Sequence, residues 1–239
     1  MAQRAKVIFG VGWVLIALIR IPWRVRARAA SVVVDRKTGT ERSLLALVSA
    51  GMGALPLLHM FTRWLRFADR QLPSWAGWLG AASHFAGVWV LWRAHSGLGR
   101  YWSDSVQLRQ GHALVTTGIY QHVRHPMYSA GWLLGIGQAL LLQNRVAGPA
   151  GLLSFALLYL SRVPREEQMM LEQFGEHYRA YMERTGSVIP RRASRPALEG
   201  EAAGPSAVRQ SSHPAGISHR DDGHRWADVD SAHTEPRQG

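Results

Sequence analysis

The residues best suited to chemistry lie in two polar segments that an apolar stretch separates. The first covers residues 111–128, is rich in histidine, and reaches an apolar run through Arg124, His125 and Pro126. Proline favours the first turn of a helix, so this segment predicts a helix that starts near Pro126. Arg124 and His125 would then lie at a helix N-terminus, where free backbone N–H groups attract a carboxylate or a phosphate.

The second polar segment begins at Arg162 and continues with Glu166 and Glu167. Arg162 and Glu166 are four residues apart, so they share one face of a helix that we expect to extend to about Arg184. A carboxylate such as Glu166 can pair with an amine or with ribose hydroxyls, and an arginine can hold an anionic group.

A metal site is a weaker explanation of the first segment. His112, His122 and His125 could bind a metal, but no acidic residue lies among them and arginines lie nearby. The chain has no cysteine, which excludes a thiolate zinc site, a disulfide scaffold and a cysteine nucleophile. Tyr120 or Tyr128 could instead face a cation. The residues therefore favour a ligand that combines a carboxylate, an amine, a ribose and a sulfonium.

A purely structural explanation of the same residues stays open at this point. Arg162 and Glu166 could form a surface ion pair, and Arg124 could contact a lipid phosphate. The tyrosines could belong to the aromatic belt that membrane proteins place at the interface. Residue types and spacing alone do not decide between a ligand site and these roles.

The elements that position the polar segments are apolar stretches of the kind that span membranes. Five of them are found, at about residues 7–21, 44–61, 75–92, 128–142 and 146–160. They predict an all-α integral membrane protein with about five transmembrane helices. We expect a cytoplasmic cofactor site formed by residues 93–128 and by the post-span helix 162–184.

The last two stretches are joined by residues 143–145 alone, and so short a connection predicts an antiparallel helical hairpin. The ends of the hairpin then bring residues 125–128 beside residues 162–166 at one membrane surface. Polar groups at a membrane edge need partners, so this convergence predicts a site. Gly131 and Gly135 either permit close helix contact or reflect the ordinary glycine content of a membrane helix.

Charge is distributed unevenly over the 239 residues. The formal net charge of +12 resides in the first 190 residues, and residues 191–239 read as a neutral, disordered tail. The basic residues lie between apolar stretches and not along one amphipathic stripe, which favours membrane lipids and argues against nucleic acid as a partner.

The positive-inside bias predicts the orientation of the chain in its membrane. The loop 22–43, the segment 93–126 and the C-terminus are expected in the cytoplasm, and the N-terminus outside. Twenty-six of the 28 basic residues other than histidine are arginine, which favours a GC-rich bacterial genome and hence a bacterial inner membrane. The expected regions are the N-terminal membrane helices 1–90 (the third ending near 92), a catalytic region 91–190 and the tail 191–239.

The run from His112 to Tyr128, HALVTTGIYQHVRHPMY, resembles the signature of the isoprenylcysteine carboxyl methyltransferase family. The second segment is similar as well, through Arg162, Glu166 and Glu167 and the run 174–178, FGEHY. The resemblance covers roughly residues 90–190. The wider superfamily includes phospholipid N-methyltransferases.

The resemblance implies S-adenosylmethionine as the methyl donor, bound at the cytoplasmic face of the membrane, and no metal. Arg162 would contact the methyl acceptor, and His125 or Glu167 would be a candidate base if the acceptor must lose a proton. The residues that would contact the cofactor are His112, Ala113, Leu114, Val115, Tyr120, His125, Pro126, Met127, Tyr128 and Glu166.

The methyl acceptor implied by the resemblance is lipidated or otherwise small and hydrophobic, with a carboxylate as the methylated group. Phospholipid N-methylation and small-thiol S-methylation would use the same segments. Two further alternatives are a nicotinamide-dependent membrane reductase of sterol-reductase-like architecture and a non-catalytic membrane protein that binds a partner. Transport is disfavoured, because no charged residue interrupts the middle of the apolar stretches.

Overall fold

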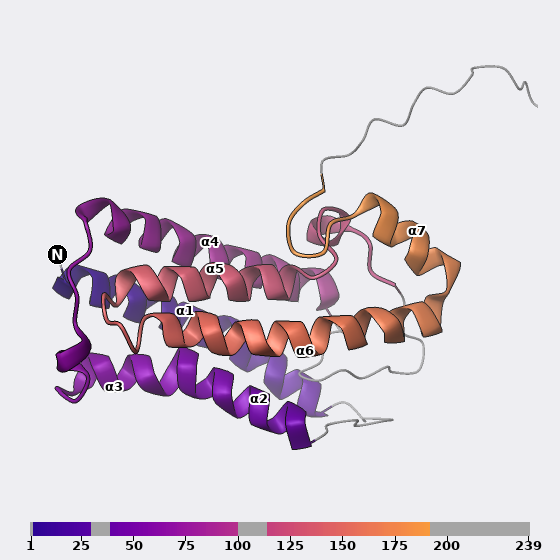
Figure 1. The fold of residues 1–239 in the computed structure, drawn as a ribbon. Coiled ribbons are helices and arrows are strands. Elements are labelled where there is room, and N and C mark those ends of the chain that lie inside the picture. Colours follow the sequence, from indigo (N-terminus) through magenta and orange to yellow (C-terminus); the bar gives the residue numbers. More distant parts are fainter. Residues whose placement is uncertain (1, 30–38, 100–113, 192–239) are drawn as a thin grey trace, which may run out of the picture. The chain divides into compact units, whose positions relative to one another are not determined.

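The computed structural model describes residues 2–29, 39–99 and 114–191, and these residues are helical with no β-strand (Figure 1). His112, Ala113 and the expected tail from residue 192 onward lie outside the described residues. The only extended pairings in the described part are two isolated bridges, Asp69 with Asn144 and Val123 with Gly186. The all-helical architecture expected from the sequence is confirmed.

The helices follow the expected apolar stretches with shifted ends: most extend beyond them, whereas α5 ends one residue earlier and α6 starts three residues later than expected. Their bounds are α1 Ala2–Ala29, α2 Gly39–Ser49, the π-helix η1 Ala50–Ala54, α3 Leu55–Phe61, α4 Ser74–Leu98, α5 Pro126–Leu141, α6 Pro149–Phe174 and α7 Glu176–Arg184, with short 3-10 turns η2 Arg66–Ala68 and η4 Gly118–Gln121. Two segments of the described chain, Gln3–Arg26 and Gly39–Phe61, are long and apolar enough to cross a membrane.

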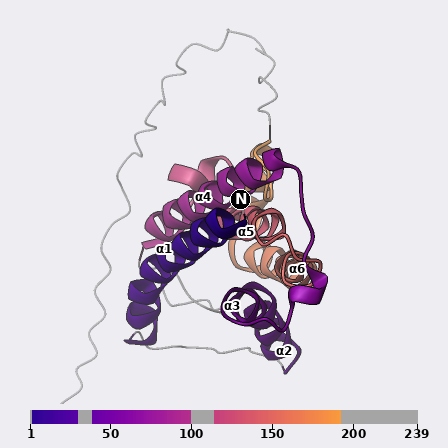
Figure 2. The same cartoon turned by 90° about the vertical axis from the view of Figure 1, so that its left-hand side faces the viewer.

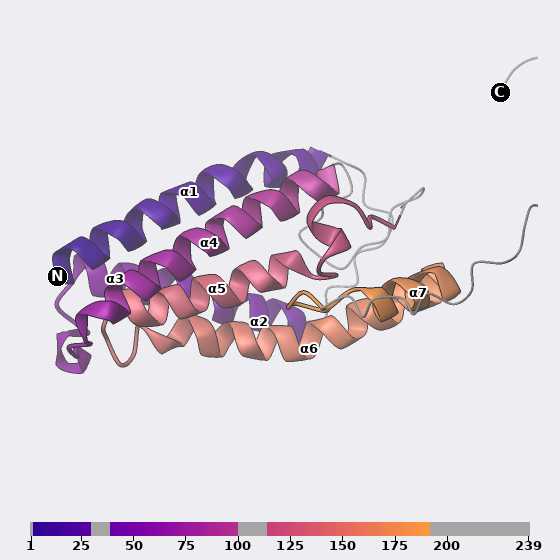
Figure 3. The same cartoon turned by 90° about the horizontal axis from the view of Figure 1, so that it is seen from above.

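The long helices pack side by side in a fixed order. α4 lies between α1 and α5, and α6 packs against α5 on one side and against α2 and η1 on another (Figures 2 and 3). Large apolar side chains point outward, among them Leu18, Trp78 and Leu160, each more than three-fifths exposed. Buried positions instead include polar groups such as His84 and Gln138. Helices that pack within lipid show this pattern, with large apolar side chains on the outside and small or polar residues between the helices.

The predicted hairpin is confirmed by α5 and α6. Its tip is held by Asn144, whose side-chain amide donates to Leu65 O at 2.7 Å and to Asp69 Oδ1 at 2.8 Å. A Cβ atom at Gly131 would overlap the ring of Phe155, and one at Gly135 would lie 3.1 Å from Leu152 Cα. The two glycines are therefore contact positions between the two helices.

The expectation of one helix over residues 162–184 is wrong. α6 contains Arg162 well inside its length and ends at Phe174, and Gly175, with a φ of 52°, separates it from α7. That φ lies in the left-handed region, which glycine adopts without steric cost, so the chain turns there. The turn directs Tyr178 and Tyr181 of α7 into the protein, where both are buried.

The close contact of α4 and α5 leads to a stability prediction at Gly137. A Cβ atom there would lie 2.9 Å from both the Cα and the backbone N of His84, atoms that cannot move without separating the helices. We expect Gly137→Ala to lower the free energy of unfolding by about 1–3 kcal/mol, as overpacking does. Gly77→Ala is the matched control, because nothing lies within 4 Å of its new methyl group. Equal thermal unfolding midpoints of the two variants in detergent would contradict the packing.

Candidate active site

The polar residues that the sequence singled out meet where α5 begins and α6 runs past it. His125 and Tyr128 of α5 and Arg162, Glu166 and Glu167 of α6 are linked by hydrogen bonds and ion pairs. Pro126 is the first residue of α5, as its position in the sequence predicts. The hairpin thus brings residues about 40 positions apart into one cluster, as expected.

Glu166 lies at the centre of the cluster. Its Oε1 accepts a hydrogen bond from the Tyr128 hydroxyl at 2.8 Å and another from Arg162 Nε at 2.8 Å. Its Oε2 lies 3.8 Å from His125 Nδ1. The carboxylate is one-fifth exposed, so it is oriented by the protein and still accessible to a ligand.

Glu167 faces the other nitrogen of His125. Its Oε1 lies 3.1 Å from His125 Nε2 and accepts hydrogen bonds from Arg124 Nη2 at 2.8 Å and Nε at 3.2 Å. The hydrogen bond with His125, followed by those with Arg124, outweighs partial burial and lowers the pKa of Glu167 to about 2. A carboxylate of so low a pKa accepts protons poorly near pH 7, which argues against Glu167 as a general base.

Arg124 has a structural role and no lipid phosphate is needed to explain it. Its side chain is 10% exposed, and Nη1 donates to Met182 O at 3.1 Å and to Thr185 O. The backbone N–H groups of Arg124 and His125 donate to Gly186 O and Ser187 O at 2.8 and 2.9 Å. These donors at the start of α5 are therefore occupied by the segment after α7, contrary to the expectation that they are free for a ligand.

The remaining predicted cofactor residues are placed around this cluster. Tyr120 is buried, and its hydroxyl donates to Ala94 O of α4 at 3.3 Å, so that hydroxyl packs two elements together. Pro126 is buried, and Leu114, Val115 and Met127 are half-buried. Among the predicted cofactor residues in the described segment 114–191, the contacts directly join His125, Tyr128 and Glu166.

One residue of the cluster carried no signal in the sequence. Glu41, in the first turn of α2, places its Oε1 3.8 Å from Arg162 Nη1, and the two side chains are 13% and 14% exposed. It lies in a stretch with no recognisable motif, and only the packing of α2 against α6 brings it here. Arg162 is thereby held between two carboxylates, Glu41 and Glu166.

The cluster borders a group of aromatic rings and contains three carboxylates. The ring of Tyr128 lies 5.7 Å from that of Tyr159 and 6.1 Å from that of Phe155, measured between centroids. Three carboxylates belong to it: Glu167 pairs with Arg124, and Glu41 and Glu166 pair with Arg162. Carboxylates beside aromatic rings are suited to a cationic ligand.

Comparison with known proteins identifies the family of this region. Residues 81–172 match the isoprenylcysteine carboxyl methyltransferase (ICMT) family. This region is similar to the ICMT family. It contains most of α4, all of α5 and α6 up to Glu172, and with them His125, Tyr128, Arg162, Glu166 and Glu167. The family assigned from the sequence is confirmed.

The ICMT-family relatives are eukaryotic enzymes. Protein-S-isoprenylcysteine O-methyltransferase B of Arabidopsis thaliana is 32% identical over 94 residues, which are 38% of this chain and 48% of the relative. The Tribolium castaneum enzyme is 37% identical over 79 residues, 33% of this chain and 28% of the relative. Enzyme A of Arabidopsis thaliana is 27% identical over 164 residues, 68% of this chain and 80% of the relative. The chain thus spans less than half the length of the first two relatives.

A solved structure of the eukaryotic intramembrane Ras methyltransferase ICMT is also similar. It matches 66% of this chain and 54% of its own, with a TM-score of 0.44 and 24% sequence identity. Glu41 and residues 185–187, which complete the cluster here, lie outside the residues that match the ICMT family.

The low pKa of Glu167 gives the ICMT-family cluster a testable pH dependence. The pKa in the folded protein is about 2 against an ordinary 4.5, so the stabilisation is complete above pH 4.5 and is lost as the pH falls toward 2. The unfolding midpoint of the unmodified protein should exceed that of Glu167→Gln by a constant amount from pH 7 to 5. That difference should shrink between pH 4.5 and 3. Glu172→Gln, at an exposed position of the same helix, should show no such trend. A difference that stays constant down to pH 3 would contradict this role of Glu167.

Proposed function

We propose that this chain is an integral membrane methyltransferase of the ICMT type that uses S-adenosylmethionine. The acceptor we propose is a lipidated or small hydrophobic molecule that carries a carboxylate. The observation that carries the proposal is Glu166, a partly exposed carboxylate held by Tyr128 and Arg162 within the region that matches the family. The names of the relatives, all protein-S-isoprenylcysteine O-methyltransferases, support the reaction class.

The donor set fits S-adenosylmethionine. A ligand with an ammonium and a sulfonium is suited to the partly exposed carboxylate of Glu166 and to the neighbouring rings of Tyr128 and Tyr159. When bound, this cofactor supplies a methyl group attached to a positively charged sulfur. We assign its binding to Glu166, His125 and Tyr128, with Leu114, Val115 and Met127 as apolar neighbours.

In the proposed reaction the protein orients the acceptor and the methyl donor and excludes water from them. The reaction needs no strong base. A carboxylate acceptor is already ionised near pH 7. Arg162 would hold it in line, and Glu41 and Glu166 fix the direction of the guanidinium. Glu167, with its low pKa, keeps His125 and Arg124 in place. Phospholipid N-methylation and thiol S-methylation would need proton removal, for which Glu167 is poorly suited.

The proposal includes the placement of the chain in a membrane. Five helical segments would cross the bilayer, with the start of α5 at the cytoplasmic face. They are α1, the continuous stretch of α2, η1 and α3, and then α4, α5 and α6. The positive-inside bias of the loops supports this orientation. The prevalence of arginine over lysine supports a bacterial inner membrane as its location.

Two measurements on the purified full chain test the proposal. S-adenosylmethionine should bind the protein in nanodiscs, and an S-prenylcysteine with a free carboxylate should then yield a methyl ester that base hydrolyses. The matched control is the same prenylcysteine with its carboxylate amidated, which should give no product. A product stable to base would assign N- or S-methylation instead. Absence of cofactor binding by folded protein would refute the methyltransferase and turn attention to nicotinamide cofactors.

A further inference from the structure

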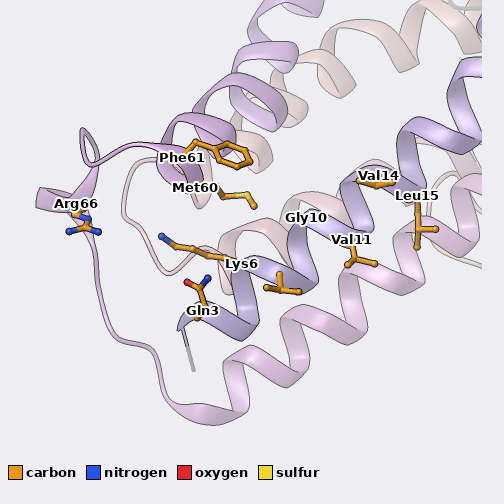
Figure 4. A pocket seen from close by; sticks show the side chains of 10 residues that line it. Gln3, Lys6, Gly10, Val11, Val14, Leu15, Met60, Phe61 and Arg66 are labelled. Atoms are coloured by element: carbon orange, nitrogen blue, oxygen red, sulfur yellow. The ribbon is translucent and has the colours of Figure 1, made fainter.

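A groove of about 590 Å³ runs along the outer face of α1, next to α3 and the loop that follows it (Figure 4). That loop packs on the tip of the α5–α6 hairpin, where Arg145 N donates to Ala68 O and Arg70 N donates to Gln143 O, each at 2.8 Å. The candidate active site lies at the other end of the same hairpin, near its Tyr128. The groove is therefore distinct from the proposed methyltransferase site.

Most of the groove is apolar. Val11, Val14 and Leu15 lie toward one end of it, and Phe61 of α3 forms part of its wall (Figure 4). Gly10 also lines the groove and has no side chain to fill it. A Cβ atom at this position would lie 3.4 Å from Met60 Cε. An apolar trough of this kind suits a hydrocarbon chain.

The other end of the groove is polar and positively charged. Gln3, Lys6 and Arg66 gather there (Figure 4). Among the described residues, neither Lys6 nor Arg66 forms an ion pair with a carboxylate. The nearby Asp69 is already engaged, 3.6 Å from His59 Nδ1 and 2.8 Å from Asn144 Nδ2. The two cations are thus available to an anionic group from outside the chain.

We propose that the groove binds an anionic phospholipid. Its phosphate would lie between Lys6 and Arg66, and one acyl chain would follow the trough to Leu15. Residues 6 to 15 of a helix span about 14 Å at its rise of 1.5 Å per residue. One leaflet is about half of a hydrocarbon core roughly 30 Å thick, so the trough matches a single acyl chain.

The charge of this end of the bundle complements such a lipid. Asp69 is the one carboxylate in the described segments 2–15, 62–73 and 143–148, which lie at this end. The cations of the same end are Arg4, Lys6, Arg63, Arg66, Arg70 and Arg145. Polybasic surfaces next to a bilayer attract anionic headgroups, and a groove between two of the cations gives one lipid a defined position. This inference goes beyond methyl transfer and needs no activity for its test.

The test measures lipid binding to the full-length protein in detergent. Phosphatidylglycerol should raise the thermal unfolding midpoint and remain bound in native mass spectrometry, whereas phosphatidylcholine of the same acyl chains should do neither. The double variant Lys6→Gln/Arg66→Gln should weaken the apparent affinity for phosphatidylglycerol by about tenfold or more. Gly10→Leu should fill the trough and so weaken the affinity for phosphatidylglycerol, although both cations remain.

The matched control is Arg63→Gln/Arg145→Gln, which removes the same charge from the same end without altering the groove lining. It should retain the affinity of the unmodified protein. An equal loss of affinity in this control would mean that the lipid responds to the overall charge of this end, and it would overturn the proposed binding site. An equal response to phosphatidylcholine, or an equal shift with glycerol phosphate alone, would also overturn the assignment to an anionic phospholipid.

Discussion

Replacing Glu166 with glutamine should weaken the binding of S-adenosylmethionine by about 30- to 100-fold. The carboxylate accepts hydrogen bonds from the Tyr128 hydroxyl and from Arg162 Nε, and its Oε2 faces His125. Glutamine keeps the size of the side chain but removes the charge. Loss of one charge-assisted interaction of roughly 1.5–3 kcal/mol corresponds to this range. Isothermal titration of purified protein in nanodiscs measures it.

Glu172→Gln is the control for this experiment. Glu172 lies on the same helix six residues further on, is exposed, and accepts a hydrogen bond from Gln168 at 3.0 Å. It removes one negative charge from α6 without touching the cluster, so the affinity for the cofactor should not change. Unaltered affinity in Glu166→Gln itself, with an unchanged unfolding midpoint, would remove Glu166 from the cofactor site.

Replacing Arg162 with alanine should lower turnover by about 100- to 1,000-fold. It should also raise the KM for the acceptor far more than the KM for the cofactor. Preorganised cations at a reacting anion contribute on this scale. The guanidinium lies 2.8 Å from Glu166 and 3.8 Å from Glu41, so its loss leaves two carboxylates without their shared partner. A smaller weakening of cofactor binding is therefore expected as well.

Arg162→Lys and Glu41→Gln test separately the charge of Arg162 and its contact with Glu41. Lysine keeps the charge but cannot address two carboxylates through separate nitrogens of one rigid plane, so it should restore only part of the turnover. Glu41→Gln should raise the KM for the acceptor with little change in the Kd for the cofactor, because Glu41 of α2 contacts Arg162, the residue assigned to the acceptor. Equal impairment of acceptor and cofactor binding by Arg162→Ala would contradict the assignment of Arg162 to the acceptor.

Local spacing explains which parts of the fold and site the sequence could predict. Pro126 starts a helix because its ring favours the first turn, and Arg162 and Glu166 pair because four residues make one helical turn. The short link after residue 142 forces an antiparallel hairpin, which brings both segments together. None of these results needs information from distant parts of the chain.

Other features depend on contacts that no local pattern encodes. The partners of Arg124 include carbonyl groups of residues 182 and 185, and a backbone carbonyl has no residue type to recognise. The sequence contains Arg124 and His125 but does not show that both side chains contact Glu167. Their combined lowering of its pKa arises because a nitrogen of each lies within hydrogen-bond distance of Glu167 Oε1. The low pKa that results argues against Glu167 as a general base.

The sequence by itself determined the all-helical architecture, the hairpin and the resemblance of roughly residues 90–190 to the ICMT family, because hydropathy, loop length and a motif are each properties of a continuous stretch. Only the tertiary structure decided that Glu41 reaches Arg162, that Gly175 ends α6, and that two cations remain beside the α1 groove. Each of these depends on how helices pack or on a single backbone conformation. Packing brings together residues whose separation along the chain carries no signal.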